Sequence, residues 1–61
     1  MKDIHELFAD LTALLEDLHG VAVEGQQAGL SPDMQAVLLS SVRDGVQRIS
    51  RIMPDIAARL P

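Results

Sequence analysis

The sequence contains no cysteine, tryptophan or tyrosine, and only one phenylalanine, among its 61 residues. Without cysteine, the chain has no disulfide bonds to support a small fold and no thiolate ligands for zinc. A chain of this length buries only about 60% of its unfolded surface, so a single pair of helices is marginally stable. The core must consist of Leu, Ile, Val and Met. We expect association with a second copy or with a partner protein to supplement it.

Long apolar runs are also absent. The longest strongly apolar run, Ala36 to Leu39, is far shorter than the roughly 20 residues that span a bilayer. The first ten residues, MKDIHELFAD, mix acids and a histidine with apolar residues, unlike the apolar region of a signal peptide. We therefore expect a soluble, cytoplasmic protein with no membrane partner.

Positive charge is scarce, with five Lys and Arg against nine Asp and Glu, for a net charge of −4. Residues 1–30 carry one cation and six acids, whereas residues 31–61 carry four arginines and three acids. Either the acidic first half complements the weakly basic second half, or it meets a basic surface on a partner. Because phosphate backbones repel acidic surfaces, we expect no direct binding of nucleic acid.

The first half predicts one amphipathic helix over about residues 3–28. Asp3 is a suitable N-cap, and Glu6 follows three residues later, as in a capping box. The apolar stripe is wider than a two-stranded coiled coil needs and is typical of a bundle of three or four helices. It comprises Ile4, Leu7, Phe8, Leu11, Leu14, Leu15, Leu18, Val21 and Ala22. Glycines at 20 and 25 disfavour helix, so the alternative is an end at Gly20 followed by a connector.

The second half predicts a turn at about 29–31 and a helix over about 32–53, with Ser31 as N-cap and Pro32 as the first helical residue. Gly45 lies in its apolar stripe, where it permits close approach of another helix or leaves a small void. Pro54 predicts a kink or a stop near Met53, followed by a short helical turn over about 54–60. The predicted fold is all-α: one domain, 1–61, forming an antiparallel two-helix hairpin that stands alone or pairs into a four-helix bundle.

Surplus apolar and charged side chains are the candidates for partner binding. The start of the second helix is apolar over more than half its circumference, so its side chains fill a homodimer core or form a partner-binding patch. Acids on the first helix and an arginine on the second would add electrostatic contacts. The candidate partner-binding residues are Met34, Val37, Leu38, Leu39, Phe8, Leu15, Asp10, Glu16, Asp17 and Arg43.

Motifs for catalysis and metal binding are missing. The sequence has no Ser/His/Asp or Cys/His constellation, no phosphate-binding glycine loop after a strand and no HExxH. His5 and His19 share a heptad position but are about 21 Å apart along a helix, so they cannot share an ion. We expect no enzymatic activity, no cofactor and no metal.

The stretch GLSPDMQAVLLSSVRD, with the later RISRI and AARLP, resembles part of the TraM-type, QseM-like antiactivators. The resemblance covers about the second half of the chain. It implies a small helical protein of a conjugative element that binds a quorum-sensing transcriptional activator of the LuxR class and blocks its action. In this chain the other helix precedes the matching segment, whereas in the family a helix follows it, so no contact residue of the family is transferred.

Two alternative functions remain open. A Rop-like dimeric four-helix bundle that binds RNA has a similar size and plan. Its first helix offers only Lys2 as a cation, whereas Arg43, Arg48 and Arg51 on the second helix could meet phosphate. An oligomerisation or scaffold module is the other. RNA binding would weaken steeply with added salt, whereas an apolar interface would not.

Overall fold

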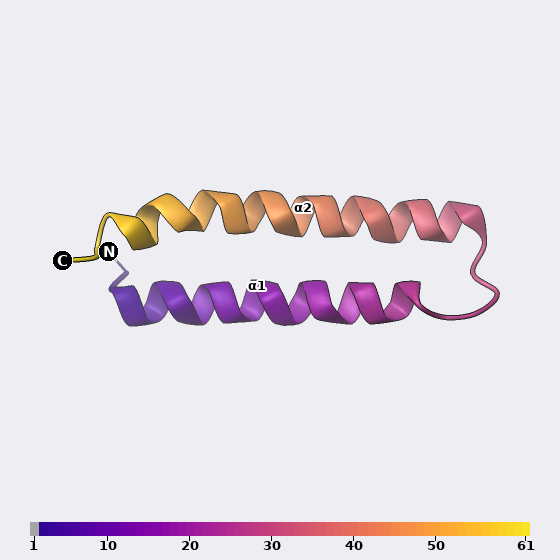
Figure 1. Cartoon of the computed structure of the whole chain (residues 1–61), viewed down its shortest axis with the longest axis horizontal. Helices are drawn as coiled ribbons and strands as arrows, with labels where there is room; N and C mark the ends of the chain where they lie inside the picture. The colour runs from indigo at the N-terminus through magenta and orange to yellow at the C-terminus, as the bar shows by residue number, and fades with distance from the viewer. Residues whose placement is uncertain (1) are drawn as a thin grey trace.

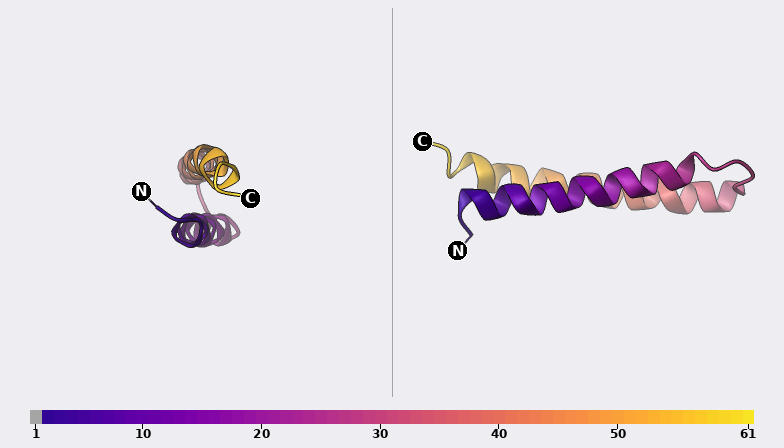
Figure 2. Two further views of the ribbon diagram at one scale, coloured as in Figure 1. Left: turned by 90° about the vertical axis from the view of Figure 1, so that its left-hand side faces the viewer. Right: turned by 90° about the horizontal axis from the view of Figure 1, so that it is seen from below.

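The computed structural model describes residues 2–61 as two antiparallel helices, α1 (Ile4–Gly25) and α2 (Pro32–Ala57). The helices lie side by side along almost their whole length, and the two ends of the chain meet at one end of the rod (Figure 1). The molecule measures 48 × 16 × 14 Å. The end-on view shows a single layer of two helices (Figure 2). The all-α hairpin that the sequence predicts is confirmed.

Both helices begin where local side-chain chemistry predicts. The Asp3 side chain accepts a 2.9 Å hydrogen bond from the backbone N–H of Glu6, and the Ser31 hydroxyl accepts one of 3.1 Å from that of Met34. Each cap satisfies an N–H that has no partner within its helix. Pro32 follows Ser31 as the first residue of α2, where the missing N–H carries no penalty.

The first helix continues through Gly20 but ends at Gly25, three residues before the predicted end at 28. The backbone N–H groups of Gln26 and Gln27 bond to carbonyls three residues earlier, Val23 and Glu24, which tightens and closes the last turn. The next three residues, Gln26, Gln27 and Ala28, are all exposed. A longer helix would therefore gain no stabilisation from burying their side chains. The loop then turns at Gly29, whose φ of 82° is in the left-handed region that favours glycine.

The second helix does not stop at Met53: it runs through Pro54 to Ala57. Of the two predicted alternatives, the stop with a separate helical turn over 54–60 is therefore wrong, and a kink within a continuous helix is the one that is left. Proline in a helix interior removes one hydrogen bond and costs about 3 kcal/mol. Tertiary packing offsets that cost, because Ile56, beyond the proline, is one of the two most buried side chains. Arg59 also holds this end, with its Nε donating to the carbonyl of Lys2 (2.7 Å) and its Nη1 to that of Asp55 (3.0 Å).

The core is a single seam of apolar residues between the helices, spaced alternately by three and four residues, as in a coiled coil. Only Leu7 (5% exposed) and Ile56 (8% exposed) are buried, and the remaining members are half-buried. The seam comprises Ile4, Leu7, Leu11, Leu14, Leu18 and Val21 from α1, with Leu38, Val42, Gly45, Ile49, Ile52 and Ile56 from α2. The predicted stripes are thus wider than the seam that the two helices share.

Gly45 is the position of close approach between the helices. A Cβ atom at this residue would lie 2.8 Å from Cγ of Leu18 and closer still to one of its methyl groups, so no void is left there. Leu18 therefore lies opposite Gly45 in the hairpin. Since the heptads run in opposite directions, the same register places Leu11 opposite Ile52.

Candidate functional site

Two rows of apolar side chains lie outside the seam, on one side of the hairpin. The residues of each row are seven apart, and each one directly follows a seam residue in the sequence. In a pair of antiparallel helices, side chains at this heptad position lie on the same side of both helices. We call these two rows the apolar face; it consists of Phe8, Leu15 and Ala22 from α1 and Leu39, Val46 and Met53 from α2. All six are exposed, with Val46, for example, at 51%.

The apolar face is continuous along the rod. The register set by Leu18 and Gly45 places Leu15 and Val46 within two residues, about 3 Å, of each other along the axis. The same spacing pairs Phe8 with Met53 towards the chain termini and Ala22 with Leu39 towards the loop. Each row is about 21 Å long at 1.5 Å per residue. The face therefore has three layers, and on α1 the side chains become smaller from Phe8 near the chain termini to Ala22 near the loop.

Carboxylates are absent from the apolar face and from the positions that flank it. By helical spacing, the flanking residues are His5, Thr12 and His19 beside the α1 row, and Ala36, Arg43, Ser50 and Ala57 beside the α2 row. All nine Asp and Glu residues occupy the other heptad positions. A chain with a net charge of −4 thus carries a face without a single negative charge.

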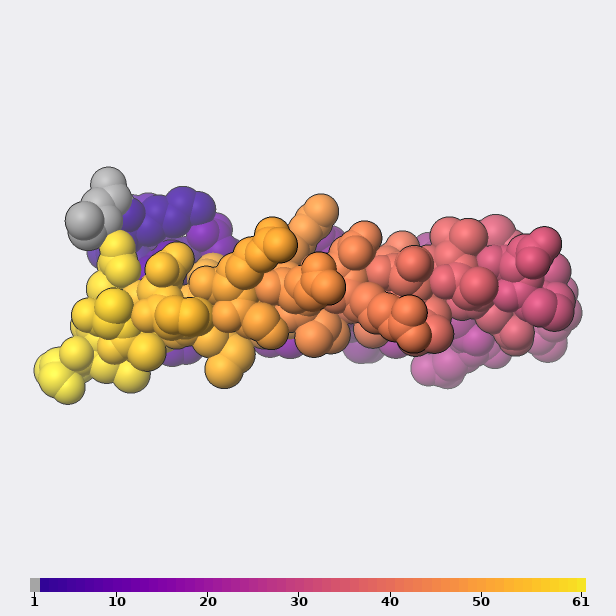
Figure 3. All heavy atoms as spheres, turned by 90° about the horizontal axis from the view of Figure 1, so that it is seen from above, coloured from indigo at the N-terminus to yellow at the C-terminus, as the bar shows by residue number. Residues whose placement is uncertain are grey.

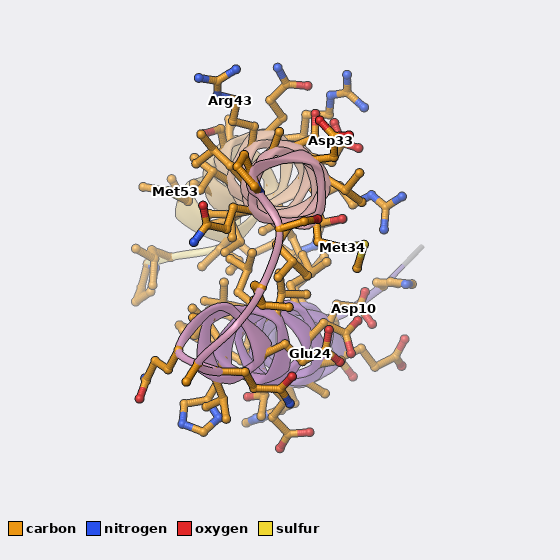
Figure 4. The ribbon with its side chains drawn as sticks, turned by 90° about the vertical axis from the view of Figure 1, so that its right-hand side faces the viewer. Asp10, Glu24, Asp33, Met34, Arg43 and Met53 are labelled. Carbon is orange, nitrogen blue, oxygen red and sulfur yellow. The ribbon has the colours of Figure 1, made fainter. Side chains whose placement is uncertain are left out.

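The opposite side of the hairpin is charged, and two shallow hollows lie along it between the helices. None of the six residues of the apolar face lines either hollow. The end view separates the two sides: Asp10 and Met34 lie on one, and Met53 lies on the other (Figure 4). We call this the charged side; its lining includes Lys2, Asp10, Asp17, Asp44, Arg48, Arg51 and Asp55.

The acids of α1 are not neutralised by the arginines of α2. Within residues 2–61 the one ion pair joins Lys2 to Asp10, and both belong to the N-terminal half of the chain. The hydrogen bond to Asp10, and then its negative charge, raise the pKa of the exposed Lys2 amine. Arg48 and Arg51 line the same hollow as Asp10 and Asp17 without forming an ion pair with them. The expected complementarity of the two halves therefore does not extend to direct ion pairs.

The ten predicted partner-binding residues do not form one patch. Phe8, Leu15 and Leu39 belong to the apolar face, and Leu38 lies in the seam. The other apolar candidates, Met34 and Val37, are about half exposed, and Met34 points to the charged side (Figure 4).

The charged candidates are similarly divided. Asp10 and Asp17 line the charged side, Glu16 is exposed on α1, and Arg43 is exposed on the outer part of α2 (Figure 4). Sequence reasoning missed Ala22, Val46 and Met53 as site residues. Their seven-residue spacing was the available signal, since it places them in the same rows as Phe8, Leu15 and Leu39.

Residues 2–61 contain neither a metal-binding cluster nor a membrane-spanning helix. No three His, Asp or Glu side chains are grouped closely enough to hold a metal ion. Neither α1 nor α2 has the combination of length and apolar character that crossing a membrane requires. Comparison with protein-family models, with curated proteins and with solved structures found no match for this chain.

Proposed function

We propose that this protein is a non-enzymatic regulator that binds a transcriptional activator of the LuxR type and acts as an antiactivator. The observation that carries the proposal is the uncompensated acidity of α1. Of its carboxylates, only Asp10 forms an ion pair within residues 2–61. Acids without an internal partner are available to a cationic surface, and the DNA-reading helices of an activator are such a surface.

Binding would be stoichiometric. The hairpin would cover the basic DNA-reading region of the activator and lower the concentration of free activator. Opposite charges would raise the rate of encounter, and contact between apolar groups would slow dissociation. Because the target acts on DNA, the proposal places the protein in the cytoplasm.

Apolar contacts for the same interface are available beside the acids. Met34 and Val37 are exposed by 47% and 56%, and Met34 lies on the side that carries Asp10 and Glu24 (Figure 4). Exposed apolar side chains next to charges are typical of binding surfaces with an apolar centre and a polar rim. The apolar candidates at the start of α2 thus support the acids of α1.

The electrostatic contribution is tested with a double variant, Glu16→Gln with Asp17→Asn, which raises the net charge by two. We expect its association rate constant with a purified LuxR-type activator, followed by stopped-flow fluorescence at low salt, to fall about tenfold. The control is Ser40→Lys with Gln47→Lys, which changes the net charge equally on the outer part of α2. Equal slowing in both variants would show that only the overall charge matters, and no slowing in either would contradict the electrostatic proposal.

A second candidate, an oligomerisation or scaffold module, is favoured by the apolar face alone. The RNA-binding alternative has less support, since the net charge is −4 and the only lysine is engaged with Asp10, so that the arginines of the second half are the cations left to meet phosphate. Added salt distinguishes these functions, because the affinity for RNA falls steeply as salt rises.

A further inference from the structure

The apolar face packs against nothing within the hairpin. Its residues have the properties of a surface that binds a second copy of the same chain. We propose that a second copy of this chain binds there, so that two hairpins form a two-fold symmetric four-helix bundle with both charged sides outward. This inference is independent of the proposed function, because Asp10 and Asp17 lie on the other side and no acid that would meet an activator belongs to the apolar face.

The first argument is the heptad period. Both rows of the apolar face repeat every seven residues, in phase with the seam. Side chains that keep this period pack into the grooves of helices with the same period. The hairpin supplies two such helices, so a second hairpin matches the face along its whole length.

The second argument is charge. In a two-fold interface the same patch is present on both sides, so an acid on the face would approach an acid of the copy. The acids of the chain all avoid the apolar face and its flanks, although they are the most abundant charged residues. The face offers no set of charges that would select an acidic or a basic partner instead.

The third argument is shape. A two-fold axis that crosses both helices near Leu15 and Val46 lays α1 over α1 of the copy, running in the opposite direction. Phe8 then faces Ala22 of the second copy, and Met53 faces Leu39. On α1 the large Phe8 thus lies opposite the small Ala22, as close packing requires, and on α2 the facing Met53 and Leu39 have similar volumes.

The fourth argument is area. The broad side of the rod measures 48 × 16 Å, about 770 Å² in projection, and the rows of the apolar face occupy about 21 Å of that length, so an interface of full size includes the residues that flank them. Stable protein interfaces bury about 800 Å² on each partner. The space-filling view from above shows a long, narrow rod (Figure 3). The hairpin itself buries only two side chains, so the dimer would supply most of the core.

A pair of valines on α2 tests the proposal. Val46 lies at the centre of the apolar face, whereas Val37 lies outside it, and their exposures are similar, 51% and 56%. We expect light scattering to give twice the chain mass of 6.6 kDa for the wild type and for Val37→Glu, at low and at high salt. Val46→Glu should weaken the dimer about 30-fold or more, as for a central contact residue.

Two results would overturn the proposal. One is a wild-type chain that stays at 6.6 kDa up to several hundred micromolar, which would leave the face to a different protein. The other is a Val37→Glu variant that dissociates as readily as Val46→Glu. If circular dichroism shows that Val46→Glu loses its helices while Val37→Glu keeps them, the face contributes to folding through the dimer, as the proposal requires.

The orientation has a separate test, because the chain has no cysteine of its own. Leu15 lies beside the proposed axis, so Leu15→Cys should form a disulfide-linked dimer under mild oxidation, whereas Val37→Cys should not. A Leu15→Cys protein that is dimeric by light scattering but does not cross-link would contradict the arrangement of α1 over α1.

Discussion

Single residues decide how closely the two helices approach each other. The side chain of Leu18 occupies the space that a Cβ atom at Gly45 would need, whereas nothing lies within 4 Å of such an atom at Gly20. Both glycines are within helices, so both carry the helix-propensity penalty of about 1 kcal/mol relative to alanine. They differ only in their surroundings, which makes them a matched pair.

We expect Gly20→Ala to increase the free energy of unfolding by about 1 kcal/mol, because it gains helix propensity without a clash. Gly45→Ala gains the same propensity but displaces Leu18 from its packed position, and overpacking of this kind costs about 1–3 kcal/mol. Its net effect should be a loss of about 1 kcal/mol. Urea denaturation followed by circular dichroism measures both values. A stabilised Gly45→Ala variant would show that the helices separate without cost at this point.

At the scale of the element, the starts of the helices could be predicted from the sequence and their ends could not. Asp3 and Ser31 cap through hydrogen bonds to residues three positions later, so neighbouring residues are sufficient to identify them. The end of α2 depends on Ile56, whose burial against α1 outweighs the local effect of Pro54. That contact joins the two ends of the chain, and local propensity carries no information about it.

The candidate site follows the same division between local and tertiary information. The apolar rows of α1 and α2 were visible as repeats, but the concentration of apolar residues near the start of α2, Met34 and Ala36 to Leu39, suggested a single patch. In the hairpin, Met34 lies on the charged side and Leu39 belongs to the apolar face. Which faces of α1 and α2 lie on a common side depends on the antiparallel register of the two helices, which the sequence of one helix does not show. Apolar residues that are neighbours in the sequence therefore lie partly on the apolar face and partly on the charged side.

Pro54 allows the balance between propensity and packing to be measured. Pro54→Ala restores the hydrogen bond to the carbonyl of Ser50 in a helix that packing already holds together, so we expect unfolding to require about 2 kcal/mol more. Pro32→Ala is the control, because at the first helical position the missing N–H has no partner, and its effect should be within about 0.5 kcal/mol. Urea denaturation of both variants provides the comparison. Equal effects at the two positions would contradict the assignment of the cost to the interior of α2.

At the scale of the whole molecule, the small core makes folding depend on assembly. With only Leu7 and Ile56 buried, an isolated hairpin of 61 residues has little to offset the entropy of ordering its chain. Pairing through the apolar face would bury six more apolar side chains in each copy. The folded state would then be a property of the dimer, and its stability would rise with protein concentration.

The melting temperature of the wild type is therefore expected to rise by about 5 °C for each tenfold increase in concentration. A tenfold change contributes about 1.4 kcal/mol per dimer, spread over twice the unfolding entropy of one chain. Val37→Glu should show the same slope and the same melting temperature, because its side chain is outside the interface, whereas Val46→Glu, with its weakened dimer, should melt lower at every concentration. Differential scanning calorimetry over a hundredfold range of concentration measures these slopes. A wild-type melting temperature that is constant over this range would mean that the hairpin folds alone, with its apolar face exposed to water.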